Sequence, residues 1–412
     1  MSKFKMFINK LINKEKNDKE SKSSNYISIK ESRAIIKYNI KQMKFYEAKK
    51  KRKLSLDEFT TIMKNENNIV EIEGLKTCFF TDNGTNMSVN SVSFNIPKNK
   101  IVGVVGESGC GKSVTSLSIM QLVQAPQGQV IDGEIRFNSD DLGYDENGNK
   151  KCYDIAKMPM QEMYKIRGKD ITMIFQEPMT SLNPVFTIGY QLDEVSFVHE
   201  PLITKEKAKE KSIEMLNKVG ISMPERVYAS YPHELSGGMR QRVMIAMALA
   251  GNPKLIIADE PTTALDVTIQ AQILELLKDI QKKEGCSVML ITHDLGVIAE
   301  MADEVVVMYA GRVIEKGTVR EIFHNPMHPY TIGLQKSKPL INSDTNEPLY
   351  SIPGQVPSAI NLPDCCYFRN RCNKCTDKCR GPYPKEIKIS DTHYVSCYLY
   401  EENEVKSNDG NK

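Results

Sequence analysis

The 412-residue sequence predicts an α/β fold in which helices cover both faces of a mostly parallel sheet. Four short apolar runs, at 101–106, 255–259, 287–292 and 304–309, have the length and β-branched composition of buried strands. The first run ends in glycine, and a helical segment begins at Lys112. Further helical segments are expected at 205–219, 239–250, 267–283 and 295–302. Buried strands that alternate with helices are typical of a parallel sheet.

Alternating apolar residues at 69–80 and 92–96 predict two strands with a turn between them. The polar, turn-rich stretch 138–154 is expected to be a surface loop. From about residue 324 the composition shifts to proline and cysteine, which indicates a small second module.

The charge balance separates the N-terminal region from the rest of the chain. Residues 1–67 hold 18 Lys or Arg and 8 Asp or Glu, whereas the other 345 residues carry a net charge of −7. A mildly acidic body argues against nucleic-acid binding, which needs a basic face. No run approaches 18 apolar residues, so the sequence predicts no membrane-spanning helix. The lysine-rich start also lacks the apolar core of a secretory signal, which favours a reducing cytosolic compartment.

The first residues have helical periodicity. Lysines are interspersed among apolar residues at Phe4, Phe7, Ile8, Leu11 and Ile12. This pattern fits a short basic amphipathic helix on an anionic membrane, but also a helix that packs on a partner, or a frayed tail. The run 49–53 is interpreted as a solvated charge cluster.

The segment GESGCGKS, which follows the first buried run, predicts a phosphate-binding loop. The glycines let successive N–H groups converge on phosphate oxygens, and the following helix contributes its positive end. Lys112 is expected to reach the β- and γ-phosphates, while the hydroxyl of Ser113 ligates Mg²⁺. The predicted nucleotide-binding residues of this loop are Gly106, Glu107, Ser108, Gly109, Cys110, Gly111, Lys112 and Ser113.

The apolar run LIIAD ends in an acid, Asp259, and a second acid, Glu260, follows it directly. Asp259, at the end of a buried strand, is placed to hold Mg²⁺ through water. Glu260 can act as the general base that polarises the attacking water. Together with the phosphate-binding loop, these residues predict hydrolysis of a nucleotide.

The segment LSGGMRQR begins a second helix suited to a γ-phosphate, with Ser236, Gly237 and Gly238 at its start. It resembles the signature of the ABC-transporter ATPases, and the motifs occur in the order of that family. The resemblance implies a P-loop ABC nucleotide-binding domain, in which a mostly parallel sheet flanked by helices is joined by an antiparallel β subdomain and a helical subdomain, and ATP as its nucleotide. It also implies roles for four more positions: Gln176 at the γ-phosphate and Mg²⁺, Asp266 at the dimer contact, His293 as the switch histidine, and Phe79, or less favourably Phe80, on adenine.

Four longer segments are similar to the oligopeptide/dipeptide importer ATPases, closest to the D-type: VGESGCGKS, FQEPMTSLNP, YPHELSGGMRQR and PTTALDVTIQAQIL. The stretches 324–334 and 351–358 match the C-terminal extension of that group. The resemblance implies a homologous, non-identical second ATPase, two membrane permeases, an extracytoplasmic peptide-binding protein, and a place on the cytoplasmic side of the cell membrane. The expected divisions are a basic extension at 1–67, the ATPase domain at 68–322, the C-terminal extension at 323–400 and a polar tail at 401–412.

Other functions are weighed against peptide import. Similar ATPases import nickel or other chelates, and soluble ABC ATPases act in translation or DNA repair. The latter usually have two cassettes or a long coiled coil, which this chain lacks. A stand-alone P-loop kinase or GTPase does not account for LSGGMRQR.

Six of the ten cysteines lie near the C-terminus. Cys366, Cys372, Cys379 and Cys397 coincide with four cysteines of the importer extension, and Cys365 and Cys375 are additional. Four thiolates in one small module can ligate a [4Fe–4S] cluster or zinc. Wide, uneven spacing favours the cluster over zinc, with unligated thiols as the third alternative.

Overall fold

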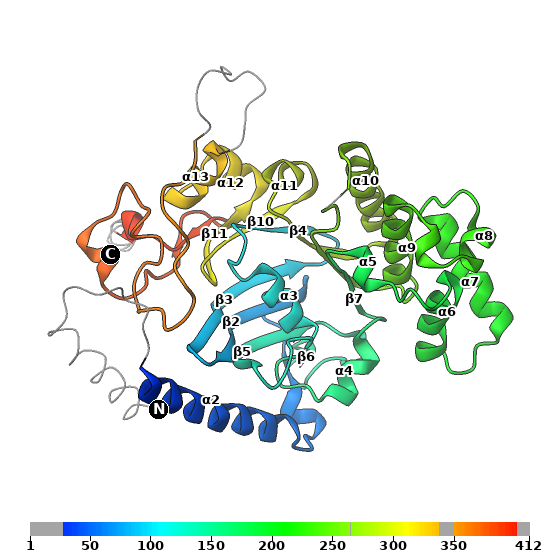
Figure 1. Ribbon diagram of the computed structural model, residues 1–412, viewed down its shortest axis with the longest axis horizontal. Helices are drawn as coiled ribbons and strands as arrows, with labels where there is room; N and C mark the ends of the chain where they lie inside the picture. The colour runs from blue at the N-terminus through cyan, green and yellow to red at the C-terminus, as the bar shows by residue number, and fades with distance from the viewer. Residues whose placement is uncertain (1–27, 264, 338–349, 402–412) are drawn as a thin grey trace.

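The computed structural model describes residues 28–263, 265–337 and 350–401 (Figure 1). Its central sheet has the strand order β12-β13-β11-β10-β4-β9-β8-β7. The five strands from β10 to β7 pair in parallel, and β11, β13 and β12 continue the sheet in antiparallel pairing. The strands are β4 (Ile101–Val105), β7 (Ile171–Ile174), β8 (Leu255–Asp259), β9 (Ser287–Ile291), β10 (Glu304–Tyr309), β11 (Arg312–Thr318), β12 (Ile387–Lys388) and β13 (Tyr394–Val395). The mostly parallel sheet that the apolar runs predict is confirmed.

A second, antiparallel sheet packs beside the first, with the order β1-β6-β5-β2-β3. Its strands are β1 (Thr60–Ile62), β2 (Asn68–Thr81), β3 (Gly84–Pro97), β5 (Gly128–Phe137) and β6 (Lys151–Asp154). The predicted surface loop over 138–154 is wrong at its C-terminal end, because Lys151–Asp154 pairs with both β5 and β1. Cys152 and Asp154 of this strand are buried, so the polar composition of the stretch concealed a strand with inward-facing residues.

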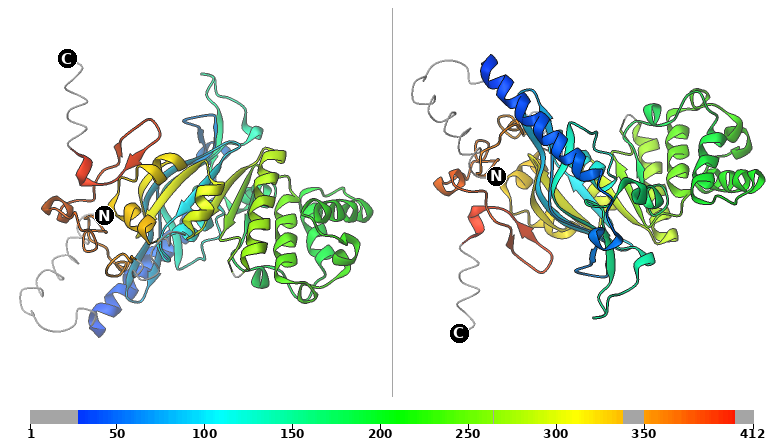
Figure 2. Two further views of the ribbon diagram at one scale, coloured as in Figure 1. Left: turned by 90° about the horizontal axis from the view of Figure 1, so that it is seen from above. Right: turned by 90° about the horizontal axis from the view of Figure 1, so that it is seen from below.

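Helices cover the central sheet and form a separate lobe, as Figures 1 and 2 show. The helices near the sheets are α3 (Lys112–Ile119), α4 (Met160–Ile166), α10 (Val267–Glu284), α11 (Leu295–Met301), α12 (Val319–His324) and α13 (Pro329–Lys336). The helical lobe holds α5 (Pro178–Ser181), α6 (Ile188–His199), α7 (Lys205–Lys218), α8 (Pro224–Ala229) and α9 (Gly237–Leu249). Strands β4, β8 and β9 are buried along their whole length. Most residues of the candidate site lie at or just after the carboxyl ends of these three strands.

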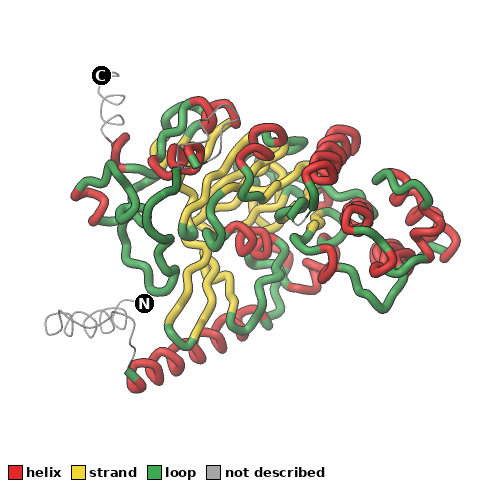
Figure 3. Tube along the Cα trace, turned by 45° about the horizontal axis from the view of Figure 1, so that its top comes forward, coloured by secondary structure: helices red, strands yellow, loops and turns green. Residues whose placement is uncertain are grey.

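A 22-residue helix, α2 (Ile29–Lys50), lies across the antiparallel sheet (Figure 3). It begins with a capping box between Ser28 and Glu31. The buried Asn39 donates from Nδ2 to the carbonyl of Thr81 at 2.7 Å, and Tyr46 stacks on Phe80. The region expected as an extension is therefore packed on the fold from residue 28, and the core includes Phe59 and Met63, ahead of the expected boundary at 67/68. The predicted amphipathic helix near the N-terminus lies outside the described residues.

The C-terminal module begins near residue 324, includes α13, and consists mainly of loops over 350–401; it joins the central sheet through β13, which pairs with β11. Glu315 of β11 fastens it further. This fully buried carboxylate accepts the N–H groups of Met327 and His328 at 2.7 and 2.9 Å, and lies 2.8 Å from Nε2 of His393. Within the three described ranges, no helix has the length and apolar character needed to cross a bilayer.

Candidate nucleotide-binding site

The phosphate-binding loop connects β4 to α3, as its sequence predicts. Gly106 and Gly111 have φ angles of +156° and +101°. A Cβ atom at Gly106 would lie 2.2 Å from the carbonyl oxygen of Met308, and one at Gly111 would lie 2.3 Å from that of Ser88. Both positions therefore require glycine, because no side chain fits and the backbone angles are unfavourable for other residues.

Lys112 is folded over this loop and is 6% exposed. Its Nζ donates to the carbonyl oxygens of Gly106 and Glu107 at 2.7 and 3.2 Å, and lies 3.8 Å from Sγ of Cys110. The ammonium group is thus held inside the phosphate-binding loop, at the N-terminal end of α3. It is positioned to exchange carbonyl oxygens for phosphate oxygens.

Ser113 and Asp259 meet at the junction of α3 and β8. The Ser113 hydroxyl donates to Oδ1 of Asp259 at 3.1 Å. Burial raises the pKa of Asp259, which is 5% exposed, because its charged form has lost contact with water. A cation between these two oxygens would compensate for that burial, and a hydroxyl and a carboxylate are ligands that Mg²⁺ accepts.

Glu260 collects side chains from three separate segments. Its Oε2 accepts hydrogen bonds from Nε2 of Gln176 at 3.0 Å and from Oγ1 of Thr263 at 2.9 Å, and its Oε1 lies 3.3 Å from Nδ1 of His293. Glu260 has a φ of +46°, a left-handed conformation that is uncommon for a residue with a side chain and is typical of functional sites. Gln176, Glu260 and His293, which come from three distant segments of the sequence, therefore lie together.

The signature lies in a different part of the molecule. Ser236 caps α9, with its Oγ accepting the N–H of Met239, and Asp266 caps α10 by accepting the N–H of Ile269. A Cβ on Gly238 would lie 3.0 Å from Ile269, so the two helix starts are neighbours. Figure 1 shows α9 in the helical lobe and α3 at the centre. Within one chain the structure does not join the signature to the phosphate-binding loop.

The structure separates the two candidates for adenine stacking. Phe80 is buried against Tyr46 of α2. Phe79, on the same strand, is half-buried and pairs in register with Asn86 of β3, two residues before Ser88, which touches Gly111. Of the two rings, that of Phe79 is therefore the more exposed.

The C-terminal module reaches the phosphate-binding loop, a contact that sequence reasoning missed. Arg371 forms a two-pronged ion pair with the carboxylate of Glu107 at 2.7 and 3.0 Å. The hydroxyl of the buried Tyr330 accepts the backbone N–H of Glu107 at 2.8 Å. Glu107 was predicted only as a member of the loop, and no local pattern marks Arg371 or Tyr330 as its partners.

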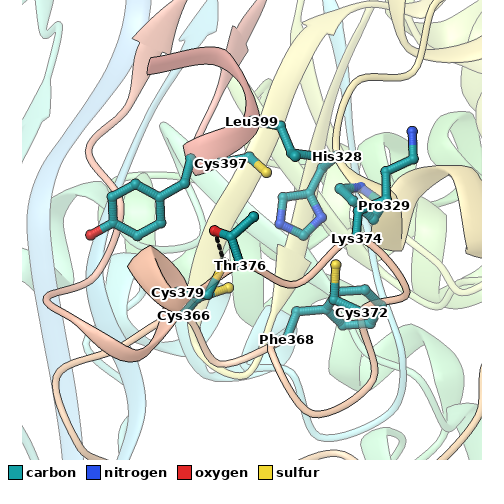
Figure 4. A pocket seen from close by; sticks show the side chains of 11 residues that line it. His328, Pro329, Cys366, Phe368, Cys372, Lys374, Thr376, Cys379, Cys397 and Leu399 are labelled. Carbon is teal, nitrogen blue, oxygen red and sulfur yellow. Dashed lines mark hydrogen bonds between the residues drawn. The ribbon is translucent and has the colours of Figure 1, made fainter. Parts of the chain in front are cut away.

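Four of the C-terminal cysteines line one pocket, which we call the cysteine pocket (Figure 4). Its lining is His328, Pro329, Cys366, Phe368, Cys372, Lys374, Thr376, Cys379, Cys397, Tyr398 and Leu399. Cys365 and Cys375 do not line it. Burial raises the pKa of Cys366 to about 12 and that of Cys397 to about 11, with smaller contributions from neighbouring thiols. Over the described ranges, no three Cys, His, Asp or Glu side chains are arranged to hold one metal ion.

Comparison with known proteins identifies two regions. Residues 89–263 match the ABC transporter family, and residues 314–379 match the oligopeptide/dipeptide transporter C-terminal region. The oligopeptide transport ATP-binding protein AppD of Bacillus subtilis is 50% identical, with 81% of this chain and 97% of that protein aligned. The dipeptide transport ATP-binding protein DppD of Bacillus subtilis is 47% identical, over 81% of this chain and 95% of that protein. The D-type resemblance is thereby confirmed.

A solved structure supports the fold. A dimeric ATP-binding cassette in a post-hydrolysis state, bound to ADP and phosphate, is 27% identical and superposes with a TM-score of 0.51. That superposition covers 61% of this chain and 99% of the cassette. The chain is thus an ATPase that uses ATP and Mg²⁺, and it belongs to the ABC transporter ATP-binding subunits that carry the oligopeptide/dipeptide transporter C-terminal region.

Proposed function

We propose that this chain couples ATP binding and hydrolysis to the uptake of oligopeptides or dipeptides across the cell membrane. The observation that carries the proposal is the meeting of Gln176, Glu260 and His293 beside the phosphate-binding loop. The names of the relatives, which transport oligopeptides and dipeptides, support the choice of substrate class.

In the proposed site, N–H groups of the phosphate-binding loop and Nζ of Lys112 hold the phosphates, and Phe79 stacks on adenine. Ser113, Asp259 and Gln176 would hold Mg²⁺, which would offset the negative charge of the phosphates. Glu260 accepts the proton of the attacking water, and His293 contacts the γ-phosphate. The hydrogen bonds that already orient Glu260 support its role as the base.

The signature requires a second subunit. Because Ser236–Gly238 opens α9 in the helical lobe, these residues are proposed to read the γ-phosphate of ATP bound to a homologous, non-identical ATPase. Asp266 would lie at the contact between the two subunits. ATP bound between two chains favours a closed dimer, and hydrolysis reopens it.

Two membrane permeases and an extracytoplasmic peptide-binding protein complete the proposed importer, with this chain on the cytoplasmic face of the membrane. A cleft of about 500 Å³ between α4 and α6 supports permease docking. Tyr164 and Val198 on its walls are 58% and 61% exposed, so they offer apolar surface to a partner.

The cysteine pocket is proposed to hold a [4Fe–4S] cluster. Cys366, Cys372, Cys379 and Cys397 fit a cluster by number and by facing one pocket, since each thiolate would bind a different iron. Bound there, the group would cross-link a module that has few regular elements of its own. Iron, sulfide and zinc analysis after anaerobic purification tests this: stoichiometric zinc or an absence of metal would each overturn it.

The import function is tested in proteoliposomes that contain this chain, its partner ATPase and both permeases. Peptides presented with the binding protein should stimulate ATP hydrolysis and accumulate inside. Stimulation by a nickel chelate but not by peptides would overturn the substrate class. Co-purification with ribosomes instead of permeases would overturn transport itself.

A further inference from the structure

Glu107 is held at each of its polar groups. Its carboxylate pairs with both terminal nitrogens of Arg371, its N–H donates to Oη of Tyr330 at 2.8 Å, and its carbonyl accepts from Lys112 at 3.2 Å. Two of these three attachments come from the C-terminal module. The position of the second residue of the phosphate-binding loop therefore depends on residues more than 200 positions away.

Arg371 is a fixed anchor. Its side chain is 6% exposed, its Nε donates to the carbonyl of Pro353 at 2.9 Å, and one terminal nitrogen donates to that of Ile352 at 3.3 Å. Pairing with Glu107 raises the pKa of Arg371, so the guanidinium stays charged. A planar guanidinium with two prongs on a carboxylate fixes orientation as well as distance.

Both anchors adjoin the cysteine pocket. Cys372, which lines the pocket, directly follows Arg371, and the lining residues His328 and Pro329 directly precede Tyr330. Phe368 links the cysteine pocket to Tyr330, because it lines the pocket and its ring contacts that of Tyr330, with centroids 5.6 Å apart. A change in the positions of the pocket cysteines would therefore shift Arg371 and Tyr330, the two residues of the module that bind Glu107.

We propose that Arg371 and Tyr330 are positioning residues of the nucleotide site. Through them, the state of the four pocket cysteines, either free thiols or bound to a metal group, sets the affinity for ATP. The affinity of such a loop depends on how well its N–H groups converge on the phosphates, so a shift of Glu107 changes it. Linkage requires the reverse as well: bound ATP must change the reactivity of the pocket. The proposal rests on ATP binding at the phosphate-binding loop, as argued above.

The first test measures the Kd for Mg-ATP by equilibrium titration of the purified full-length protein with a fluorescent ATP analogue. Arg371→Lys keeps the charge but loses the two-pronged geometry, and should raise Kd about 10-fold. Tyr330→Phe keeps the buried ring and removes only the acceptor, and should raise Kd about 5-fold. The matched control, Tyr228→Phe, removes a hydroxyl bond to Asp193 in the helical lobe and should leave Kd unchanged.

The second test determines whether the pocket acts through Arg371. Cys372→Ser should change Kd severalfold in the wild-type background and much less in Arg371→Lys, as a double-mutant cycle reports. Saturating Mg-ATP should also alter the rate at which iodoacetamide labels the pocket cysteines in the wild-type protein, and less so in Arg371→Lys.

The outcomes separate this inference from the assignment of the nucleotide site. Wild-type protein that fails to bind Mg-ATP would contradict the site itself. Normal wild-type binding with unchanged Kd values in folded Arg371→Lys and Tyr330→Phe would overturn the positioning role. An equal effect of Cys372→Ser in both backgrounds, or labelling that ignores ATP, would overturn the link to the cysteine pocket.

Discussion

Replacing Glu260 with glutamine removes a base while preserving the shape of the side chain. Three groups surround this carboxylate: the amide of Gln176, the hydroxyl of Thr263 and the ring of His293. A glutamine at this position has one oxygen that can accept from both Gln176 and Thr263, and an NH2 group that can donate to Nδ1 of His293, so the surrounding contacts are kept and the base is lost. Loss of a general base lowers turnover by about 10²–10⁴-fold, equivalent to about 3–5 kcal/mol in the barrier.

ATP binding should survive Glu260→Gln. Lys112 and Ser113 bond to the loop and to Asp259, not to Glu260. The negative charge of Glu260 also contributes to the raised pKa of Asp259, so its removal favours the ionised form that binds Mg²⁺. The expected result is an ATP-bound, closed dimer that turns over slowly.

The assay is phosphate release by the assembled transporter, combined with gel filtration in Mg-ATP. Glu284→Gln is the matched control, because Glu284 lies at the end of α10 and forms a partly exposed ion pair with Lys218. Hydrolysis by Glu260→Gln at the wild-type rate would refute the assignment of the base and the reading of the geometry around it.

Three further changes give separate outcomes. Phe79→Ala should raise the Kd for ATP about 10-fold through lost stacking, whereas Phe80→Ala should leave Kd unchanged and lower the free energy of unfolding by about 3 kcal/mol in urea. Lys112→Ala should weaken ATP binding in the same titration. Hydrogen bonds from Ser390 and other neighbours outweigh burial and lower the pKa of Glu321 to about 2. Its stabilisation is thus complete above pH 4.5 and is lost as pH falls towards 2, so Glu321→Gln should cost about 1–2 kcal/mol at pH 7 and little near pH 2.

Each of these has a contrary result. Equal Kd values for Phe79→Ala and wild type would exclude that ring from the adenine site. Unaltered ATP affinity in Lys112→Ala would contradict its phosphate contact. A stability difference for Glu321→Gln that stays constant from pH 7 to pH 3 would show that the carboxylate charge is not the source of the effect.

The sequence was sufficient to predict the elements whose residues interact locally. The runs that form β4, β8, β9 and β10 are mostly apolar because both faces of each strand are buried along nearly its whole length, and the glycines of the phosphate-binding loop follow from its tight turn. Gln176 and His293 were selected through a family resemblance, and the structure brings them to Glu260.

Long-range contacts could not be predicted in this way. Arg371 and Glu107 are 264 positions apart, and neither residue type is unusual in its own segment. Lys151–Asp154 forms a strand because its backbone pairs with both β5 and β1, although its polar flanks are typical of a loop. Helix α2 docks through Asn39 and Tyr46, two residues that the basic composition of the region obscured.

Helix α2 also affects how this protein can be produced and compared with its relatives. The ABC transporter match begins at residue 89, so a shortened form that starts at residue 68 keeps all of it and is a simple choice for expression. Such a form would uncover Phe80, leave Gln129 without its bond to Glu47, and lose the buried Phe59. Removal of residues 1–67 would therefore expose apolar surface on the antiparallel sheet and favour aggregation. A poor yield of the shortened form would then reflect the missing helix and not a defective ATPase domain.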